Sequence, residues 1–128
     1  MEMKKIYAQI SLGELTDKIS ILEIKKKKIV NKNHLKFINK EHHLLQSTLS
    51  RYYKKSTRYK KLKNRLKKVN LCIWEYENQK RQIQKHLEKF ILVSKNVYKY
   101  NDLRSKLKNK IDKINRSDFL EIKQYAKY

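Results

Sequence analysis

The absence of proline is the feature that most constrains the fold of this 128-residue chain, and Gly13 is its only glycine. Proline breaks helix interiors and glycine supplies the backbone of many tight turns, so long helices meet few interruptions here. Turns are left to Asn, Ser and Asp. Apolar residues recur at helical spacing over most of the chain. The sequence therefore predicts an all-α fold, a bundle of about four helices with a short C-terminal helix or tail.

Capping residues and apolar stripes place the expected helices. Ser11 and Glu14 form the S-x-x-E pattern of a capping box, which starts a first helix that runs to about residue 30. Further helices are expected over about 34–51 and 58–85, and from about Phe90 to Ile114 with a cap or kink at 101–102. Outside them we expect an extended segment at 4–10, a turn at 31–33, a connection at 52–61 and a helix over 118–125 capped by Ser117.

Length and charge limit the class of protein. A chain of 128 residues buries one modest core, so we expect a single helical domain over 1–128. Neither a signal-peptide core nor a stretch of about 18 apolar residues occurs, which favours a cytoplasmic protein without membrane partners. The net charge is +22, and Lys, Asn, Ile and Tyr are jointly abundant. Because A- and T-rich codons encode these four residues, we attribute much of the charge to a biased genome, that of a virus or of an AT-rich bacterium. If the source is a virus, the expected location of the protein is the host cytoplasm.

Metal and cofactor sites find little support in the sequence. Cys72 is the only cysteine, which excludes a disulfide and a multi-thiolate zinc site. His42 and His43 are adjacent and point about 100° apart on a helix, while His34 and His86 have no ligand set at suitable spacing. A phosphate-cradling loop needs more glycines than this chain has. We therefore expect no metal and no cofactor, and we interpret the lysine run at 25–28 as a solvated helix end.

Acidic residues are rare, 12 in all, and half of them lie in short polar motifs beside apolar stripes. These six acids are Glu14, Asp17, Glu23, Glu77, Asp102 and Glu121. Each motif also carries Lys or Arg. One interpretation is a set of structural ion pairs, on solvated faces or in a buried network. The other is a shared cleft that binds a polar or phosphorylated ligand.

Four sequence blocks resemble a family of short bacterial and viral proteins of unknown function. Its pattern reads roughly S-x-G-E-L-x-D-K-x-x-I-L-x-I-K, then V-N-x-x-L-W-x-x-E, then V-Y-x-x-N-D-x-R-x-x-I-K, then E-x-K-x-Y. The likeness runs in the same order over nearly the whole chain, with Ile73 at the Leu position of the second block and Leu107 at the Ile position of the third. The resemblance implies a site containing Ser11, Gly13, Glu14, Asp17, Lys18, Lys25, Asn70, Trp74, Glu77, Arg81, Asn101, Asp102, Arg104, Lys108, Glu121, Lys123 and Tyr125. Asp112 stands where the family usually has Asn, and a glycine-bearing turn before Phe90 is missing. An association of the family with surface-glycan genes implies sugar or sugar-nucleotide chemistry.

The leading hypothesis is a protein that binds a small polar or anionic ligand, such as a nucleotide, a sugar nucleotide or a glycan precursor. In this hypothesis the ligand binds in a cleft between the first, third and fourth expected helices. Its cations are expected to be Lys18, Lys25, Arg81, Arg104 and Lys108, with acids that orient them and Trp74 as a stacking surface.

Two alternatives stay open. One is a small all-α enzyme with Glu77, Asp17 and Asp102 as catalytic candidates, in which apolar surroundings raise the pKa of Glu77 toward neutrality. The other is a non-specific nucleic-acid binder that uses surface lysines with Tyr52, Tyr53 and Tyr59. Because 28 of the 34 basic residues are Lys, which lacks the planar fork of Arg, we rank it below the ligand hypothesis. A second copy of the chain is a further partner left open.

Overall fold

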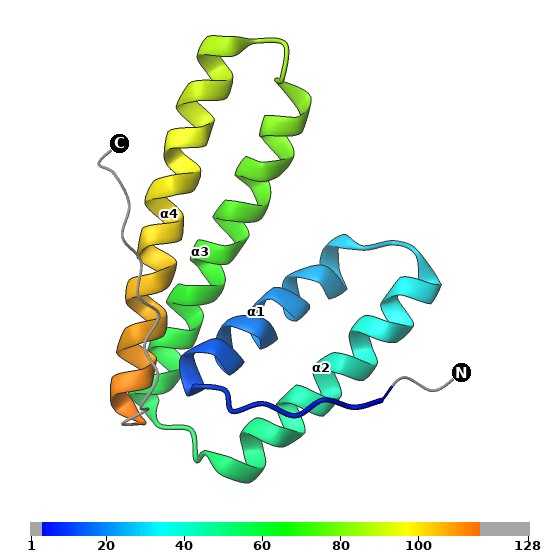
Figure 1. Cartoon of the computed structure of the whole chain (residues 1–128), viewed down its shortest axis with the longest axis vertical. Coiled ribbons are helices and arrows are strands. Elements are labelled where there is room, and N and C mark those ends of the chain that lie inside the picture. The colour runs from blue at the N-terminus through cyan, green and yellow to red at the C-terminus, as the bar shows by residue number, and fades with distance from the viewer. Residues whose placement is uncertain (1–3, 116–128) are drawn as a thin grey trace.

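The computed structural model describes residues 4–115, and these residues form four helices without a strand (Figure 1). The helices are α1 (Leu12–Lys28), α2 (Lys32–Tyr52), α3 (Thr57–Gln82) and α4 (Leu87–Ile114). The predicted all-α class is confirmed. The expected helix over 118–125, and with it Glu121, Lys123 and Tyr125, lies outside the described residues. Within the described range, no helix combines the length and the apolar content that a bilayer crossing requires.

Two antiparallel helix pairs make up the molecule. The longer helices α3 and α4 lie side by side, and α1 with α2 forms a second pair that meets them near one end (Figure 1). Among the described helices, α1 alone is adjacent to all three others, whereas α2 is adjacent only to α1. The far half of the α3–α4 pair extends beyond α1 (Figure 1). Contacts that link α1 to both α3 and α4 therefore concentrate where the two pairs meet.

A single apolar cluster fills the junction of the two pairs. Its buried members come from all four helices: Leu12, Leu15, Ile19, Leu49, Tyr59, Leu62, Leu66, Leu107 and Ile111. Burial of these side chains is the main favourable term that holds the helices together. Tyr59 is fully buried, and its hydroxyl lies 2.8 Å from the Thr16 hydroxyl, so the polar end of the ring is satisfied inside the core.

The connection expected at 52–61 is shorter than that, because α3 begins at Thr57, one residue before the expected start of the third helix at about 58. Ser56 caps it, with its side-chain oxygen 3.1 Å from the backbone nitrogen of Tyr59. Tyr59 continues the buried stripe of Leu62 and Leu66 at helical spacing. A tyrosine among lysines looked like surface, yet its ring faces the core. Only residues 53–56 connect α2 to α3.

Three other local predictions have mixed outcomes. The Ser11 cap is confirmed, because its side-chain oxygen accepts a hydrogen bond of 3.1 Å from the backbone N–H of Glu14. The turn at 31–33 is shorter than expected, since Asn31 caps α2 by accepting from the N–H of His34 and the helix starts at Lys32. The expected cap at 101–102 is wrong, because α4 continues as one helix through these residues. Residues 4–10 carry no regular structure.

Gly13 marks the closest approach between α1 and α4. Its N–H donates a hydrogen bond of 2.6 Å to the Asp112 carboxylate, and a Cβ at Gly13 would lie 2.4 Å from the carbonyl oxygen of Lys108. The glycine is required here because there is no space for a side chain. Burial raises the pKa of Asp112 above its ordinary value and outweighs the opposing hydrogen bonds from Gly13 and Ser11. The only glycine of the chain thus fixes the crossing of its first and last described helices.

Candidate functional site

A buried polar network joins α1, α3 and α4 beside the apolar core. The Asp17 carboxylate is 3% exposed and accepts two hydrogen bonds from Arg104, 2.9 Å from Nε and 2.5 Å from Nη2. It also accepts one of 2.9 Å from the side-chain amide of Asn70, which donates in turn to the Ser20 hydroxyl at 2.7 Å. A bidentate pair of this kind holds both partners in one geometry. The Arg104 guanidinium is therefore fixed in place by α1.

A pocket of about 240 Å³ opens beside this network, and we call it the Trp74 pocket. It is lined by Ile21, Ile24, Asn70, Ile73, Trp74, Glu77, Asn78, Arg81 and Arg104. Helix α3 supplies most of these side chains, α1 supplies the two that begin the list, and α4 supplies Arg104. Five residues of the predicted site, from two helices, thus line a single hollow. Asp17 lies behind it, bound to Arg104.

Charge and exposure differ across the Trp74 pocket. Trp74, the only tryptophan of the chain, is half-buried, while Arg81 lies exposed at the rim. The Glu77 carboxylate is 48% exposed and lies 4.0 Å from the Lys80 amine. The catalytic interpretation expected Glu77 in apolar surroundings, which this exposure contradicts. The pocket offers an aromatic ring, two guanidinium groups and a solvated carboxylate.

Other predicted site residues lie away from the Trp74 pocket. Lys108 is buried at the α1–α4 crossing, where its amine lies 2.6 Å from the Glu14 carboxylate. It therefore links α1 to α4 and does not line the pocket. Lys18 is exposed and Lys25 is half-buried, and neither lines the pocket. Asn101 and Asp102 are half-buried on α4, also outside the lining. Of the five cations predicted for the cleft, only Arg81 and Arg104 line the Trp74 pocket.

Within residues 4–115 no group of three or more His, Cys, Asp or Glu is placed to hold a metal ion.

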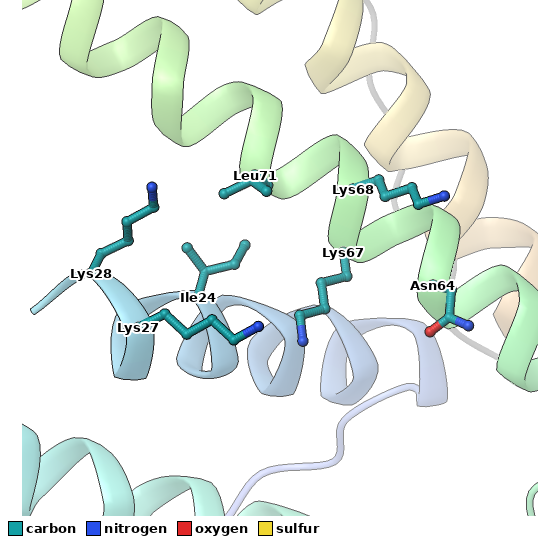
Figure 2. Close-up of a pocket in the computed structure, with 7 residues that line it drawn as sticks. All are labelled: Ile24, Lys27, Lys28, Asn64, Lys67, Lys68 and Leu71. Atoms are coloured by element: carbon teal, nitrogen blue, oxygen red, sulfur yellow. The ribbon is translucent and has the colours of Figure 1, made fainter.

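A second hollow, which sequence reasoning missed, lies between α1 and α3 (Figure 2). It has a volume of about 460 Å³ and is lined by Ile24, Lys27, Lys28, Asn64, Lys67, Lys68 and Leu71. We call it the lysine pocket. Ile24 also lines the Trp74 pocket, so the two hollows share one wall residue. Each lysine run alone resembles a solvated helix face, and only the crossing of the helices brings them together.

Glu23 forms a half-buried charge cluster next to the lysine pocket. Its carboxylate lies 3.2 Å from the Lys63 amine, 3.0 Å from the Lys67 amine and 3.6 Å from a ring nitrogen of His42. Burial acts to raise the pKa of Glu23, but the hydrogen bonds and charges of Lys67 and Lys63 outweigh it, and the pKa lies below its ordinary value of 4.5. The folded protein thus favours the ionised form.

Replacing Glu23 with glutamine is expected to lower the free energy of unfolding by about 1 kcal/mol at neutral pH, a modest effect because solvent screens the half-buried cluster. A lowered folded-state pKa contributes stability above the unfolded value of 4.5, and this contribution is lost as the pH falls through the folded value. The difference between wild type and Glu23→Gln should therefore shrink as the pH falls below 4.5 and through the lower pKa of the folded state. Urea unfolding of both proteins, from neutral pH to a pH below 4.5, measures this difference in the free energy of unfolding.

Glu75→Gln is the matched control, because Glu75 pairs with Lys28 in an exposed position and its loss should change stability little. A difference between wild type and Glu23→Gln that is the same at both ends of the pH range would contradict the ionic origin of the stabilisation.

Comparison of the chain with protein-family models, with curated proteins and with solved structures yields no match in any of the three. The resemblance carried by the four sequence blocks therefore stays a prediction.

Proposed function

We propose that this protein binds a small anionic ligand with a single ring, of the nucleotide or sugar-phosphate kind, in the Trp74 pocket. The observation that carries the proposal is that Trp74, Arg81 and Arg104 line one hollow between α1, α3 and α4. An indole ring stacks on a base or on the apolar face of a sugar, and guanidinium groups bind phosphate with directional hydrogen bonds.

The network behind the pocket supports this function. Arg104 is ordered by its bidentate bond to Asp17, and Asn70 is ordered by its bonds to Asp17 and Ser20. Side chains that are already ordered lose little conformational entropy when a ligand arrives. The near-neutral pair of Asp17 and Arg104 positions the wall of the pocket, and Arg81 at the rim supplies the stronger attraction for an anion.

The size of the pocket narrows the ligand class. Its volume of about 240 Å³ is just below the range of about 300–1,000 Å³ that is typical of small-molecule sites. One ring with its charged group fits such a space, whereas the remainder of a sugar nucleotide extends into solvent. Glu77 and Asn78 at the same wall accept hydrogen bonds from ligand hydroxyls.

The single tryptophan makes the proposal testable by fluorescence. Excitation at the red edge, where tyrosine does not absorb, reports on Trp74 alone. We expect saturable quenching by at least one of uridine monophosphate, uridine diphosphate glucose and glucose 1-phosphate. In Arg81→Gln the midpoint should rise about tenfold, because a charged hydrogen bond to phosphate is lost.

Arg65→Gln is the matched control, since Arg65 is an exposed arginine of α3 outside both pockets. Its midpoint should equal that of the wild type. Absence of saturable quenching with all three compounds, or the same midpoint in Arg81→Gln and wild type, would refute ligand binding in this pocket.

A further inference from the structure

We propose that the lysine pocket is a second anion site, which binds the phosphate chain of a di- or triphosphate. Four of its seven lining residues are lysines, two from the end of α1 and two from the middle of α3 (Figure 2). The site is separate from the Trp74 pocket and does not depend on the function proposed for that pocket.

The charge balance of the lysine pocket favours an anion. Lys28 pairs with Glu75 at 2.8 Å, and Lys67 pairs with Glu23 at 3.0 Å. Lys27 and Lys68, by contrast, make no ion pair with any carboxylate among residues 4–115. Two positive charges are therefore left uncompensated around one hollow. Walls of low dielectric focus the field of such charges into the concave space and concentrate anions there.

The arrangement of the amines indicates an extended phosphate chain as the ligand. Figure 2 shows Lys67 extending from α3 toward α1, with Lys27 lying along α1 in its direction. Lys28 extends from the end of α1 toward α3, and Lys68 lies along α3, so the four amines are spread along the two helices. Separate ammonium groups act as point charges and do not form the planar fork that grips one carboxylate. They match an anion whose charge is spread over several phosphoryl groups. The volume of about 460 Å³ lies within the usual range of about 300–1,000 Å³ for small-molecule sites.

The lining also argues against a nucleic-acid strand as the occupant. No aromatic residue is among the seven lining side chains, so the pocket offers no stacking surface for successive bases. Ile24 and Leu71 are its apolar lining residues, and Asn64 adds an amide that donates hydrogen bonds. A short oligophosphate uses the amines and the amide without any need for a ring.

Calorimetric titration of the full chain with inorganic tripolyphosphate, at fixed ionic strength, tests the inference. We expect binding of one anion per chain in the wild type. Lys27→Gln with Lys68→Gln should weaken it at least about tenfold, because both uncompensated charges are lost. Both residues are exposed, so this double variant should fold, and its thermal unfolding is measured alongside.

Two control variants separate a site from general surface charge. Lys60→Gln with Lys61→Gln removes the same charge from exposed positions of α3 outside the pocket, and its affinity should change less than about threefold. Lys27→Arg with Lys68→Arg keeps the charge and should retain binding. Equal losses in the two glutamine double variants would overturn the inference, because the anion would then respond only to net charge.

Two further arms distinguish other sources of a positive result. Arg81→Gln should leave tripolyphosphate binding unchanged. If Arg81→Gln abolishes binding while the Lys27 and Lys68 double variant keeps it, the anion occupies the Trp74 pocket, and the inference fails while the proposed function stands. If the wild type binds single-stranded oligouridylate through Lys27 and Lys68 but does not bind tripolyphosphate, the pocket serves a nucleic-acid backbone and the inference is likewise overturned.

Discussion

Replacing Gly13 with alanine is expected to lower the free energy of unfolding by about 3 kcal/mol, the upper part of the range for overpacked sites. The new Cβ would lie 2.4 Å from the carbonyl oxygen of Lys108 and 2.8 Å from a carboxylate oxygen of Asp112. The carbonyl belongs to a helix backbone, so α1 and α4 must separate. That movement also stretches the 2.6 Å hydrogen bond from Gly13 to Asp112 and opens the core beneath it.

Whether Gly13→Ala lowers or raises the free energy of unfolding tests the close approach of α1 and α4. Alanine is more favourable than glycine in a helix by about 1 kcal/mol, and Gly13 lies in the first turn of α1. Without the close approach, Gly13→Ala would therefore stabilise the protein. Denaturant unfolding followed by circular dichroism decides between the two signs, and an increase in stability would show that α1 and α4 are not in contact here.

Replacing Arg104 with methionine is expected to lower the free energy of unfolding by about 3 kcal/mol, because it leaves the Asp17 carboxylate buried without its cation. Asp17 is 3% exposed and cannot recover hydration in place. Its hydrogen bond from Asn70 survives, which keeps the loss at the lower end of the range for broken buried pairs. Removal of both charges, in Asp17→Leu with Arg104→Met, should restore most of the stability, since Asn70 still bonds to Ser20.

Lys28→Met provides the comparison for an exposed pair. Lys28 and Glu75 are 40% and 48% exposed at a separation of 2.8 Å, so the loss there should stay below about 1 kcal/mol. Urea unfolding of the wild type, Asp17→Leu, Arg104→Met and the variant with both changes forms a double-mutant cycle for the Asp17–Arg104 pair. A loss in Arg104→Met no larger than in Lys28→Met would contradict a buried role for the Asp17 pair.

The helices were predictable because their causes are local. The Ser11 cap, the apolar stripes and the absence of proline each act within a few residues, and over residues 4–115 the structure contains the four helices that they indicate. Tyr59 was assigned to the surface because it lies among lysines and tyrosines, although its spacing from Leu62 and Leu66 places it on the buried stripe of α3. The expected cap at 101–102 is absent because polar residues suited to a cap are also accommodated within a helix.

The candidate site was predictable only in part, because it depends on how helices cross. Asn70, Trp74, Glu77 and Arg81 follow one another at steps of three and four on α3, so their shared face was visible in the sequence. Lys108 follows the same spacing from Arg104, yet α1 crosses α4 so that Glu14 meets Lys108 while Asp17 meets Arg104. The lysine pocket joins residues about forty positions apart, and no periodicity within one helix indicates such a contact.

The hydrogen bond between Gly13 and Asp112 spans 99 positions of the chain. During translation, the first turn of α1 leaves the ribosome long before its acceptor on α4 has been synthesised. Until then Leu12 and Leu15 also lack Leu107 and Ile111, their companions in the core. The nascent chain must therefore keep part of its apolar surface open to solvent or to a chaperone until about residue 112 has emerged, and only then can both helix pairs close on each other.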